Sequence, residues 1–277
     1  MKKSALVLAA ALTAALSVAA FAGDDNTIII GATPTPHGEI LEQAKPLLEE
    51  LGYTLDIQIF EDYVIPNNVV ESGEVDANYF QHVLYLNDFN AQNGTHLVNA
   101  GGIHYEPFGI YGGKKASLDE LEDGDSIAVP NDPTNEARAL LLLQENGVLT
   151  LKEGVGLEAT KTDVESYAKD IELVEVEAAQ VPHLLGDVSY AVMNGNYALE
   201  AGFSAGKDAI ALETADSDAI SQYVNVIAVK EGNEDSEKIQ ALVSVLTSDE
   251  IRDFINETYD GSVVPYAPAE EEEAATE

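Results

Sequence analysis

Residues 126–147, SIAVPNDPTNEARALLLLQENG, predict a strand, a tight polar loop and a helix in succession. The short apolar strand at 126–129 ends at Pro130, because proline cannot donate a hydrogen bond to a sheet ladder. The loop offers Asp132 or Thr134 as the N-cap of the helix, and strong helix formers follow up to an Asn-Gly stop. We therefore expect a helix whose first backbone amides are free to bind an anion.

Arg138 lies in the first turns of this predicted helix, where its positive charge opposes the helix dipole. Only one other arginine, Arg252, occurs in the chain. An arginine at so unfavourable a place suggests a function, and a bidentate grip on a ligand carboxylate suits its planar group. The alternative interpretation is a structural salt bridge to one of the many acidic residues.

The rest of the chain alternates apolar strands with amphipathic helices. A β-branched run at 27–32, a helix at 39–51 and an alternating strand at 54–60 form a βαβ unit, which implies parallel strands. Residues 80–89 are predicted as a helix, and residues 105–111 as a single strand. Further βαβ patterns follow in the second half, so the sequence predicts an α/β protein with mixed sheets and helices on both sheet faces.

Two lobes with a cleft between them fit this order of elements. We expect lobe 1 to comprise residues 27–111 and 225–264, and lobe 2 to comprise residues 112–224, with the Gly-Gly-Lys-Lys segment at 112–115 as a hinge. In open α/β sheets, ligands bind beyond the carboxyl ends of the strands. Polar loops follow several of the predicted strands, so they are expected to converge on one ligand cleft.

The first 22 residues have the pattern of a signal peptide. Two lysines precede an alanine-rich apolar stretch that ends in an A-x-A cleavage site at Ala22. No later segment approaches the length of a membrane span. The sequence has no cysteine, which excludes disulfides, cysteine-based zinc sites and a lipid-bearing cysteine after the apolar run. We therefore expect an exported, soluble protein, cleaved near Ala22 and free in the periplasm.

The chain is strongly acidic, with 50 Asp and Glu residues against 13 Lys and Arg residues and a net charge of −37. Such a charge excludes nucleic acid and anionic membrane surfaces as partners. We interpret the acidity as a surface adaptation to a saline exterior, where salt screens the charges. Calcium binding is the rival interpretation, although no D-x-D-x-D-G loop is present. The charged segment 267–277 is predicted to be a disordered tail.

Aromatic side chains gather between residues 63 and 85 in a chain that has few of them. Such rings can line an apolar slot and make favourable contacts with a thioether. Ordinary core packing is the alternative. The candidates are Tyr63, Phe80, His82 and Tyr85.

Three asparagines are candidates for polar contacts with a ligand. Asn194 and Asn196 follow a predicted buried strand, and Asn225 interrupts the apolar run YVNVIAV. A buried amide needs hydrogen-bond partners, which a ligand ammonium or carboxylate could supply. The alternative is that each amide ties two backbone loops together.

No pattern in the sequence indicates catalysis or a cofactor. The five histidines are scattered without H-x₃-H or H-E-x-x-H spacing, so a metal site could arise only through folding. No G-x-S-x-G, P-loop or G-x-G-x-x-G motif is present. We expect no enzyme activity, no cofactor and no metal.

Several segments in this order closely resemble one family. They include GEVDANYFQH at 73–82, PNDPTN followed by RALLLL, AVMNGNYALEAG at 191–202 and YVNVIAV at 223–229. The chain thus resembles the NlpA/MetQ lipoprotein family, the methionine-binding subunits of bacterial methionine ABC importers. The similarity runs from about residue 28 to residue 264. It implies a two-lobed periplasmic-binding-protein fold of type II that closes on a free amino acid and delivers it to a membrane permease and its ATPase.

The resemblance also implies roles for residues. An aromatic slot for the methionine side chain, a carboxylate-binding arginine and polar contacts to the ligand's amino and carboxylate groups carry over to Tyr63, Phe80, His82, Tyr85, Arg138, Asn194 and Asn225. Asn196 is carried over as a neighbour of these residues, in the loop that reads N-G-N-Y here. The chain departs from the family in two ways. The loop that usually reads P-G-P-H in the family has Thr35 in place of the glycine here, and the lipobox cysteine is missing.

From this resemblance we expect a monomeric solute-binding protein for L- or D-methionine. The alternatives within that class are another apolar amino acid or a methionine-containing dipeptide. An exported enzyme with a bilobal fold is an alternative from another class. A surface adhesin that acts through the acidic tail is a third.

Overall fold

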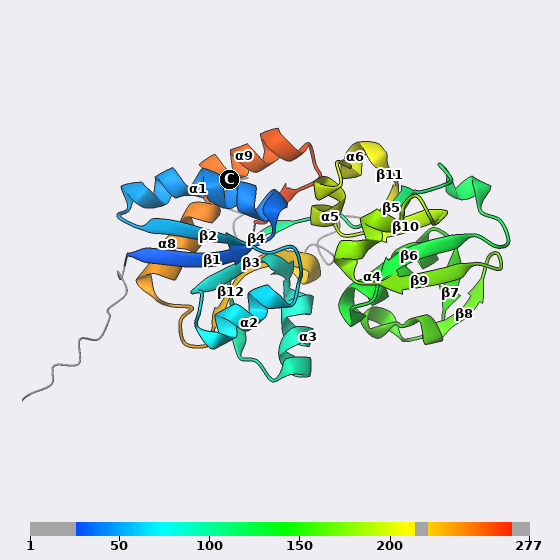
Figure 1. Ribbon diagram of the computed structural model, residues 1–277, viewed down its shortest axis with the longest axis horizontal. Helices are drawn as coiled ribbons and strands as arrows, with labels where there is room; N and C mark the ends of the chain where they lie inside the picture. Colours follow the sequence, from blue (N-terminus) through cyan, green and yellow to red (C-terminus); the bar gives the residue numbers. More distant parts are fainter. Residues whose placement is uncertain (1–25, 214–220, 268–277) are drawn as a thin grey trace, which may run out of the picture.

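The computed structural model describes residues 26–213 and 221–267. Its helices and strands form two α/β lobes that lie side by side (Figure 1). The mixed α/β fold class is therefore confirmed. The predicted signal peptide and the predicted tail, apart from Ala267, lie outside the described residues. No helix within the described ranges combines the length and hydropathy needed to cross a membrane.

The first lobe is built on a six-stranded sheet of order β13-β4-β12-β3-β1-β2. Strand β1 runs parallel to β2 and β3, whereas β12 is antiparallel to both β3 and β4. A late segment of the chain therefore lies at the centre of the sheet. The strands are β1 (Thr27–Ala32), β2 (Thr54–Ile59), β3 (Ala77–His82), β4 (Leu97–Tyr105), β12 (Val224–Lys230) and β13 (Val264–Pro265).

Helices cover both faces of this sheet (Figure 1). One face packs apolar residues of three helices into a shared core, namely α1 (Glu39–Glu50), α8 (Glu237–Leu246) and α9 (Asp249–Tyr259). The other face is covered by α2 (Ile65–Ser72) and α3 (Val83–Asn93). A short helical turn, η1 (Pro34–Gly38), links β1 to α1 and contains the cis peptide bond Thr35–Pro36.

The second lobe is built on a five-stranded sheet of order β11-β5-β10-β6-β9, with a separate two-stranded ribbon. The sheet strands are β5 (Gly109–Gly112), β6 (Ser126–Pro130), β9 (Glu172–Val176), β10 (Tyr190–Met193) and β11 (Ala209–Leu212), and the ribbon is β7 (Leu149–Leu151) with β8 (Val164–Tyr167). Its helices are α4 (Pro133–Glu145), α5 (Gly195–Glu200) and α6 (Ala205–Asp208), with short turns at η2 (Leu118–Glu120), η3 (Gly156–Glu158), η4 (Lys161–Asp163) and η5 (Ala178–Leu184).

Two element predictions were wrong. Residues 80–89 do not form one helix, because β3 continues to His82 and α3 begins at Val83. Residues 105–111 do not form one strand either. The chain leaves the first sheet after Tyr105 and enters the second at Gly109, with Glu106-Pro107-Phe108 between them. Proline at 107 cannot donate to a ladder, which favours the break there.

The crossing points shift the limits expected for the lobes. Residues 109–111, expected in lobe 1, pair with β10 in the second sheet. Val224, expected in lobe 2, pairs with Tyr105 in the first sheet. The first crossing between the sheets therefore lies at residues 106–108, and the chain has re-entered the first sheet by Val224.

Candidate functional site

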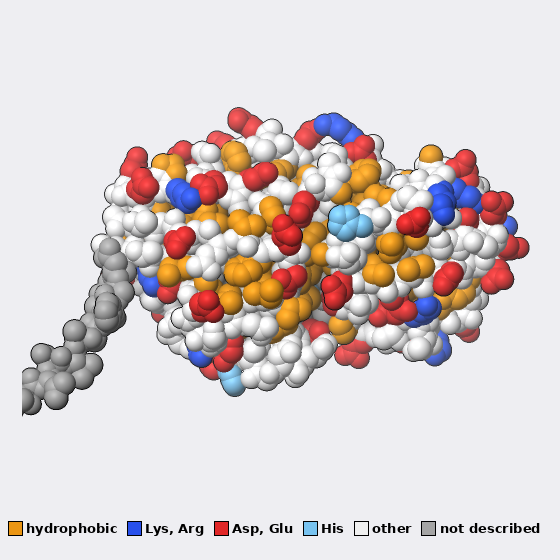
Figure 2. All heavy atoms as spheres, in the orientation of Figure 1, with side chains coloured by type: hydrophobic (Ala, Val, Ile, Leu, Met, Phe, Trp, Pro, Cys, Tyr) orange, Lys and Arg blue, Asp and Glu red, His pale blue; other side chains and the backbone are white. Residues whose placement is uncertain are grey.

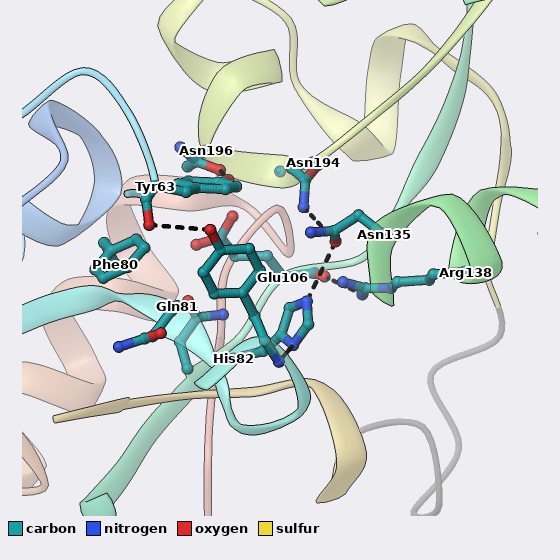
Figure 3. Close-up of a pocket in the computed structure, with 12 residues that line it drawn as sticks. Tyr63, Phe80, Gln81, His82, Glu106, Asn135, Arg138, Asn194 and Asn196 are labelled. Atoms are coloured by element: carbon teal, nitrogen blue, oxygen red, sulfur yellow. Dashed lines mark hydrogen bonds between the residues drawn. The ribbon is translucent and has the colours of Figure 1, made fainter. Parts of the chain in front are cut away.

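One pocket lies between the lobes and takes its wall from both (Figure 3). Its unoccupied volume, counted with the solvent in its opening, is about 320 Å³. All eight residues chosen from the sequence line it: Tyr63, Phe80, His82, Tyr85, Arg138, Asn194, Asn196 and Asn225. Four lining residues escaped the sequence reasoning: Gln81, Glu106, Asn135 and Gly195.

Aromatic rings form the side of the pocket opposite Arg138 (Figure 3). The ring centroid of Tyr63 lies 5.5 Å from that of Phe80 and 5.6 Å from that of Tyr85. Phe80, Tyr85 and Phe89 form one small buried cluster against which Tyr63 packs. The two interpretations of these rings, ordinary core packing and an apolar ligand slot, are therefore compatible. The same rings pack on each other and line the pocket.

His82 joins the two lobes at the junction of β3 and α3. Its Nδ1 accepts a hydrogen bond from the backbone N–H of Tyr85 at 3.0 Å, which caps α3. Its Nε2 lies 3.2 Å from Asn135 Oδ1 on α4. Burial, and then the charge of Arg138, lower the pKa of His82 to about 3. The ring is therefore neutral at physiological pH, and its Nε2–H donates to Asn135.

Arg138 is buried in the pocket wall and is paired with an acid of the protein. Its Nε donates to Glu213 Oε2 at 2.9 Å, and its Nη2 donates to Glu213 Oε1 and to the backbone oxygen of Glu106. Its guanidinium also lies over the ring of Tyr223, 4.0 Å from the centroid. The salt-bridge alternative is therefore what the structure shows, although the side chain still lines the pocket.

The amides at the start of α4 are not all free, contrary to the prediction. Asp132 is the N-cap, and its Oδ1 accepts the backbone N–H of Asn135 at 3.0 Å. Both Asp132 oxygens also accept from the Asn135 side chain. Burial raises the pKa of Asp132. The helix end is therefore already occupied by a carboxylate of the protein, a common arrangement at N-termini.

The asparagines have unused hydrogen-bonding capacity at the pocket. Asn194 Nδ2 donates to Asn135 Oδ1 at 2.8 Å, and Asn225 Oδ1 lies 3.0 Å from His37 Nε2. Asn194 Oδ1 and Asn196 Nδ2 are buried without a hydrogen-bond partner among the described residues. The pocket therefore offers one hydrogen-bond acceptor and one donor without a partner among the described residues. Buried polar atoms normally have a hydrogen-bond partner.

Glu106 is the only acidic side chain in the lining of this pocket. Its Oε1 lies 2.8 Å from Nε2 of His104 and 3.5 Å from Nε2 of His37, and the backbone N–H of Asn196 donates to its carboxylate. Burial raises the pKa of Glu106. The sequence did carry a signal for it, a lone charged residue inside the apolar run YEPFGIY, which was assigned to a strand interior.

His37, His104 and Glu106 form the one group among the described residues that could hold a metal ion. Their ligand atoms lie within 4.8 Å of one another. Folding brings them together from η1, β4 and the crossing segment, so their spacing in the sequence gave no sign of it. Hydrogen bonds already explain the positions of the two histidine rings without a metal ion. The Nδ1 atom of His37 contacts the hydroxyl of Thr33, and that of His104 contacts the hydroxyl of Tyr79.

A wider cavity adjoins the pocket and shares Tyr63 and Tyr85 with it. Its unoccupied volume is about 880 Å³, and acids at Asp62, Asp132 and Glu177 stand in its wall. Tyr63 and Tyr85 thus line both cavities, and the acids of the wider one disfavour anions.

Comparisons with known proteins agree on one family. The family model described as NlpA lipoprotein matches residues 28–267. The chain is 41% identical to the methionine-binding lipoprotein MetQ of Bacillus subtilis (strain 168) over 278 residues, which cover 96% of this chain and 99% of that protein.

Two solved structures share the fold. A nutrient binding protein from Burkholderia cenocepacia bound to methionine is 40% identical with a TM-score of 0.83, covering 87% of this chain and all of that one. An ABC transporter periplasmic substrate-binding protein from Coxiella burnetii is 37% identical with a TM-score of 0.81, covering 86% of this chain and all of that one.

The comparisons contradict the expected localisation. The matching family and the Bacillus relative are both named as lipoproteins. The expectation of a protein without a lipid anchor, free in the periplasm, is therefore wrong. It rested on the absence of cysteine from the sequence.

Proposed function

The chain belongs to the NlpA lipoprotein family, and on that premise we propose that it captures methionine in the pocket between its lobes and delivers it to an ABC importer. The partners are methionine, a membrane permease and the ATPase subunit of that permease. Nucleic acid is no partner of so acidic a chain. The protein acts as a monomer, with no metal or cofactor.

The observation that carries this proposal is the mixed chemistry of the pocket. Rings at Tyr63, Phe80 and Tyr85 form one side, and the cationic Arg138 stands on the other. Between them lie the unpaired acceptor of Asn194 and the unpaired donor of Asn196. A free amino acid with an apolar thioether side chain offers a partner to each of these groups.

The binding step is closure of the lobes, with no bond made or broken in the ligand. Among the described residues, the hydrogen bonds that join the lobes around the pocket include His82 to Asn135, Tyr63 to Asn196, and Tyr197 to the backbone oxygen of Glu61. Opening the cleft breaks them, and a ligand that contacts both lobes favours closure again. The ligand carboxylate reaches the arginine at Nη1, the nitrogen that is not used by Glu213 or Glu106.

Titration calorimetry with L-methionine, D-methionine and alanine tests the ligand. Alanine lacks one methylene, the sulfur and the terminal methyl group, and each buried group of this size contributes about 0.8 kcal/mol. Alanine should therefore bind roughly 50-fold more weakly than the preferred methionine enantiomer. Equal affinities for alanine and methionine would contradict the role of the aromatic slot.

A thermal-shift screen distinguishes the alternative ligands, because a molecule that binds only the native state raises the melting temperature. A shift with another apolar amino acid or a methionine-containing dipeptide, and none with methionine, selects that alternative. Mass spectrometry of methionine after incubation checks that no turnover occurs.

A further inference from the structure

Glu106 is a buried carboxylate in the pocket lining without a cationic partner. Its exposed fraction is 5%. Among the described residues, its carboxylate forms no ion pair with lysine or arginine, and Arg138 contacts its backbone oxygen instead. The other acid at this site, Glu213, is paired with Arg138. A buried charge of this kind is costly unless a cation compensates it.

The two histidines beside Glu106 do not supply that cation. Burial lowers the pKa of His37 to about 4 and that of His104 to about 3, so both rings are neutral at physiological pH. His104 holds the carboxylate in place by a hydrogen bond, His37 lies beside it, and neither ring compensates its charge.

The surroundings of Glu106 suit an ammonium group. A primary ammonium donates three hydrogen bonds, and the unpaired Asn194 Oδ1 is a second acceptor in the same lining. Gly195 leaves room for the carboxylate, since a Cβ at that position would lie 2.6 Å from Glu106 Oε2. Both features come from α5 and the residue that precedes it.

The presence of Arg138 beside Glu106 also suits an α-amino acid. Such a ligand has its ammonium and its carboxylate on one carbon, so its site must place an anion and a cation side by side without pairing them. Arg138 Nη2 bonds the backbone oxygen of Glu106 at 2.9 Å, which makes the two residues neighbours in the wall. The arginine charge faces Glu213, and the Glu106 carboxylate faces the histidines.

We propose that Glu106 binds the α-ammonium of the ligand, and that the site thereby selects amino acids with a free amino group. This inference rests on the proposed function. From the sequence, only asparagines were assigned to bind the ligand ammonium. An amide is neutral, whereas the Glu106 carboxylate contributes a full opposite charge. The acceptor of Asn194 completes the ammonium's contacts, and Asn196 Nδ2 is left for the ligand carboxylate.

The test combines a charge-removing variant with a ligand that lacks the ammonium. Glu106→Gln keeps the shape of the side chain, and 2-hydroxy-4-(methylthio)butanoate replaces the ammonium of methionine with a hydroxyl. Calorimetry should show that the variant binds methionine on the order of 100-fold more weakly, as when one partner of a buried charge pair is removed. The hydroxy analogue should bind the variant and the wild-type protein within about threefold of each other.

Glu136→Gln is the matched control. Glu136 is also buried, accepts the backbone N–H of Lys161 and does not line the pocket. This variant should bind methionine as the wild-type protein does.

Two outcomes overturn the inference. One is that Glu106→Gln retains wild-type affinity for methionine. The other needs no variant: the wild-type protein binds the hydroxy analogue as tightly as methionine, which decides the matter even if Glu106→Gln does not fold. A wild-type protein that binds neither ligand but binds another solute refutes the proposed function instead, so the two failures are distinguishable.

Discussion

At the scale of single residues, Arg138 shows how a charge is kept inside a pocket wall. Its guanidinium is flanked by the rings of Phe108 and Tyr223, with centroids at 4.7 Å and 4.0 Å, and two of its nitrogens donate to the Glu213 carboxylate. Only a planar, weakly hydrated cation can combine stacking with a bidentate contact. The same residue therefore serves the fold through Glu213 and also lines the pocket.

We predict that Arg138→Met destabilises the protein by about 3–5 kcal/mol, because it leaves the carboxylate of Glu213 buried without its partner. The side chains of the pair are only 5% and 12% exposed. The double variant Arg138→Met with Glu213→Gln removes both charges and should recover part of that loss. Urea denaturation measures all three proteins. A double variant less stable than the single one would show that the pair is not the cause.

At the scale of elements, the junction between β3 and α3 gives the pocket one of its links between lobes. The strand ends at His82, whose ring caps the helix with Nδ1 and contacts Asn135 of the other lobe with Nε2. Helical spacing of aromatic residues could not reveal this boundary, because the residues before the cap belong to a strand buried along its whole length. An N-cap residue is predicted from a side chain that can accept a hydrogen bond from the first helical amides. Histidine is not among the residues commonly found at that position.

Stability should depend on pH through His82. Its pKa is 6.5 in the unfolded chain and about 3 in the folded protein, so between these values the unfolded state binds more protons. The stabilisation by the neutral ring is present above pH 6.5 and is lost as pH falls towards 3.

His82→Asn keeps a capping acceptor and has no titrating ring. Between pH 6.5 and pH 5 the wild-type protein should therefore lose about 2 kcal/mol more free energy of unfolding than the variant, at about 1.4 kcal/mol per pH unit. Denaturation curves at the two pH values give the difference. Parallel pH profiles for the two proteins would rule out His82 as the source.

At the scale of the whole molecule, the acidic surface opposes compactness. Acidic side chains are spread over the face shown in Figure 2, with few lysines and arginines between them. With a net charge of −37, like charges repel across the surface, and this repulsion is long-ranged only when salt is low.

Sodium chloride should therefore stabilise the protein. Raising its concentration from roughly 10 mM to 1 M shortens the screening length from about 30 Å to about 3 Å, and the melting temperature should rise by several degrees. Differential scanning calorimetry measures the shift, with an equal osmolality of sucrose as the control for effects that are not electrostatic. A melting temperature that falls with chloride would mean that surface ion pairs outweigh the repulsion.

Local patterns of the sequence were sufficient for the fold class and for the pocket side chains on either side of the cleft. Strand and helix periodicities depend on residues a few positions apart, and loops after buried strands point to one edge of a sheet. For this reason Tyr63, at one wall, and Asn194, at the other, each of which follows a predicted strand, could be chosen without coordinates and do line one pocket.

Only the tertiary structure decided which charges meet. Arg138 pairs with Glu213, 75 residues away, and Glu106 meets His37 and His104 because the chain crosses between sheets at that point. With 50 acidic residues in the chain, no local pattern singles out the one that an arginine will contact. The choice depends on which side chains burial brings together and deprives of water, since desolvation is what makes one partner far better than the others.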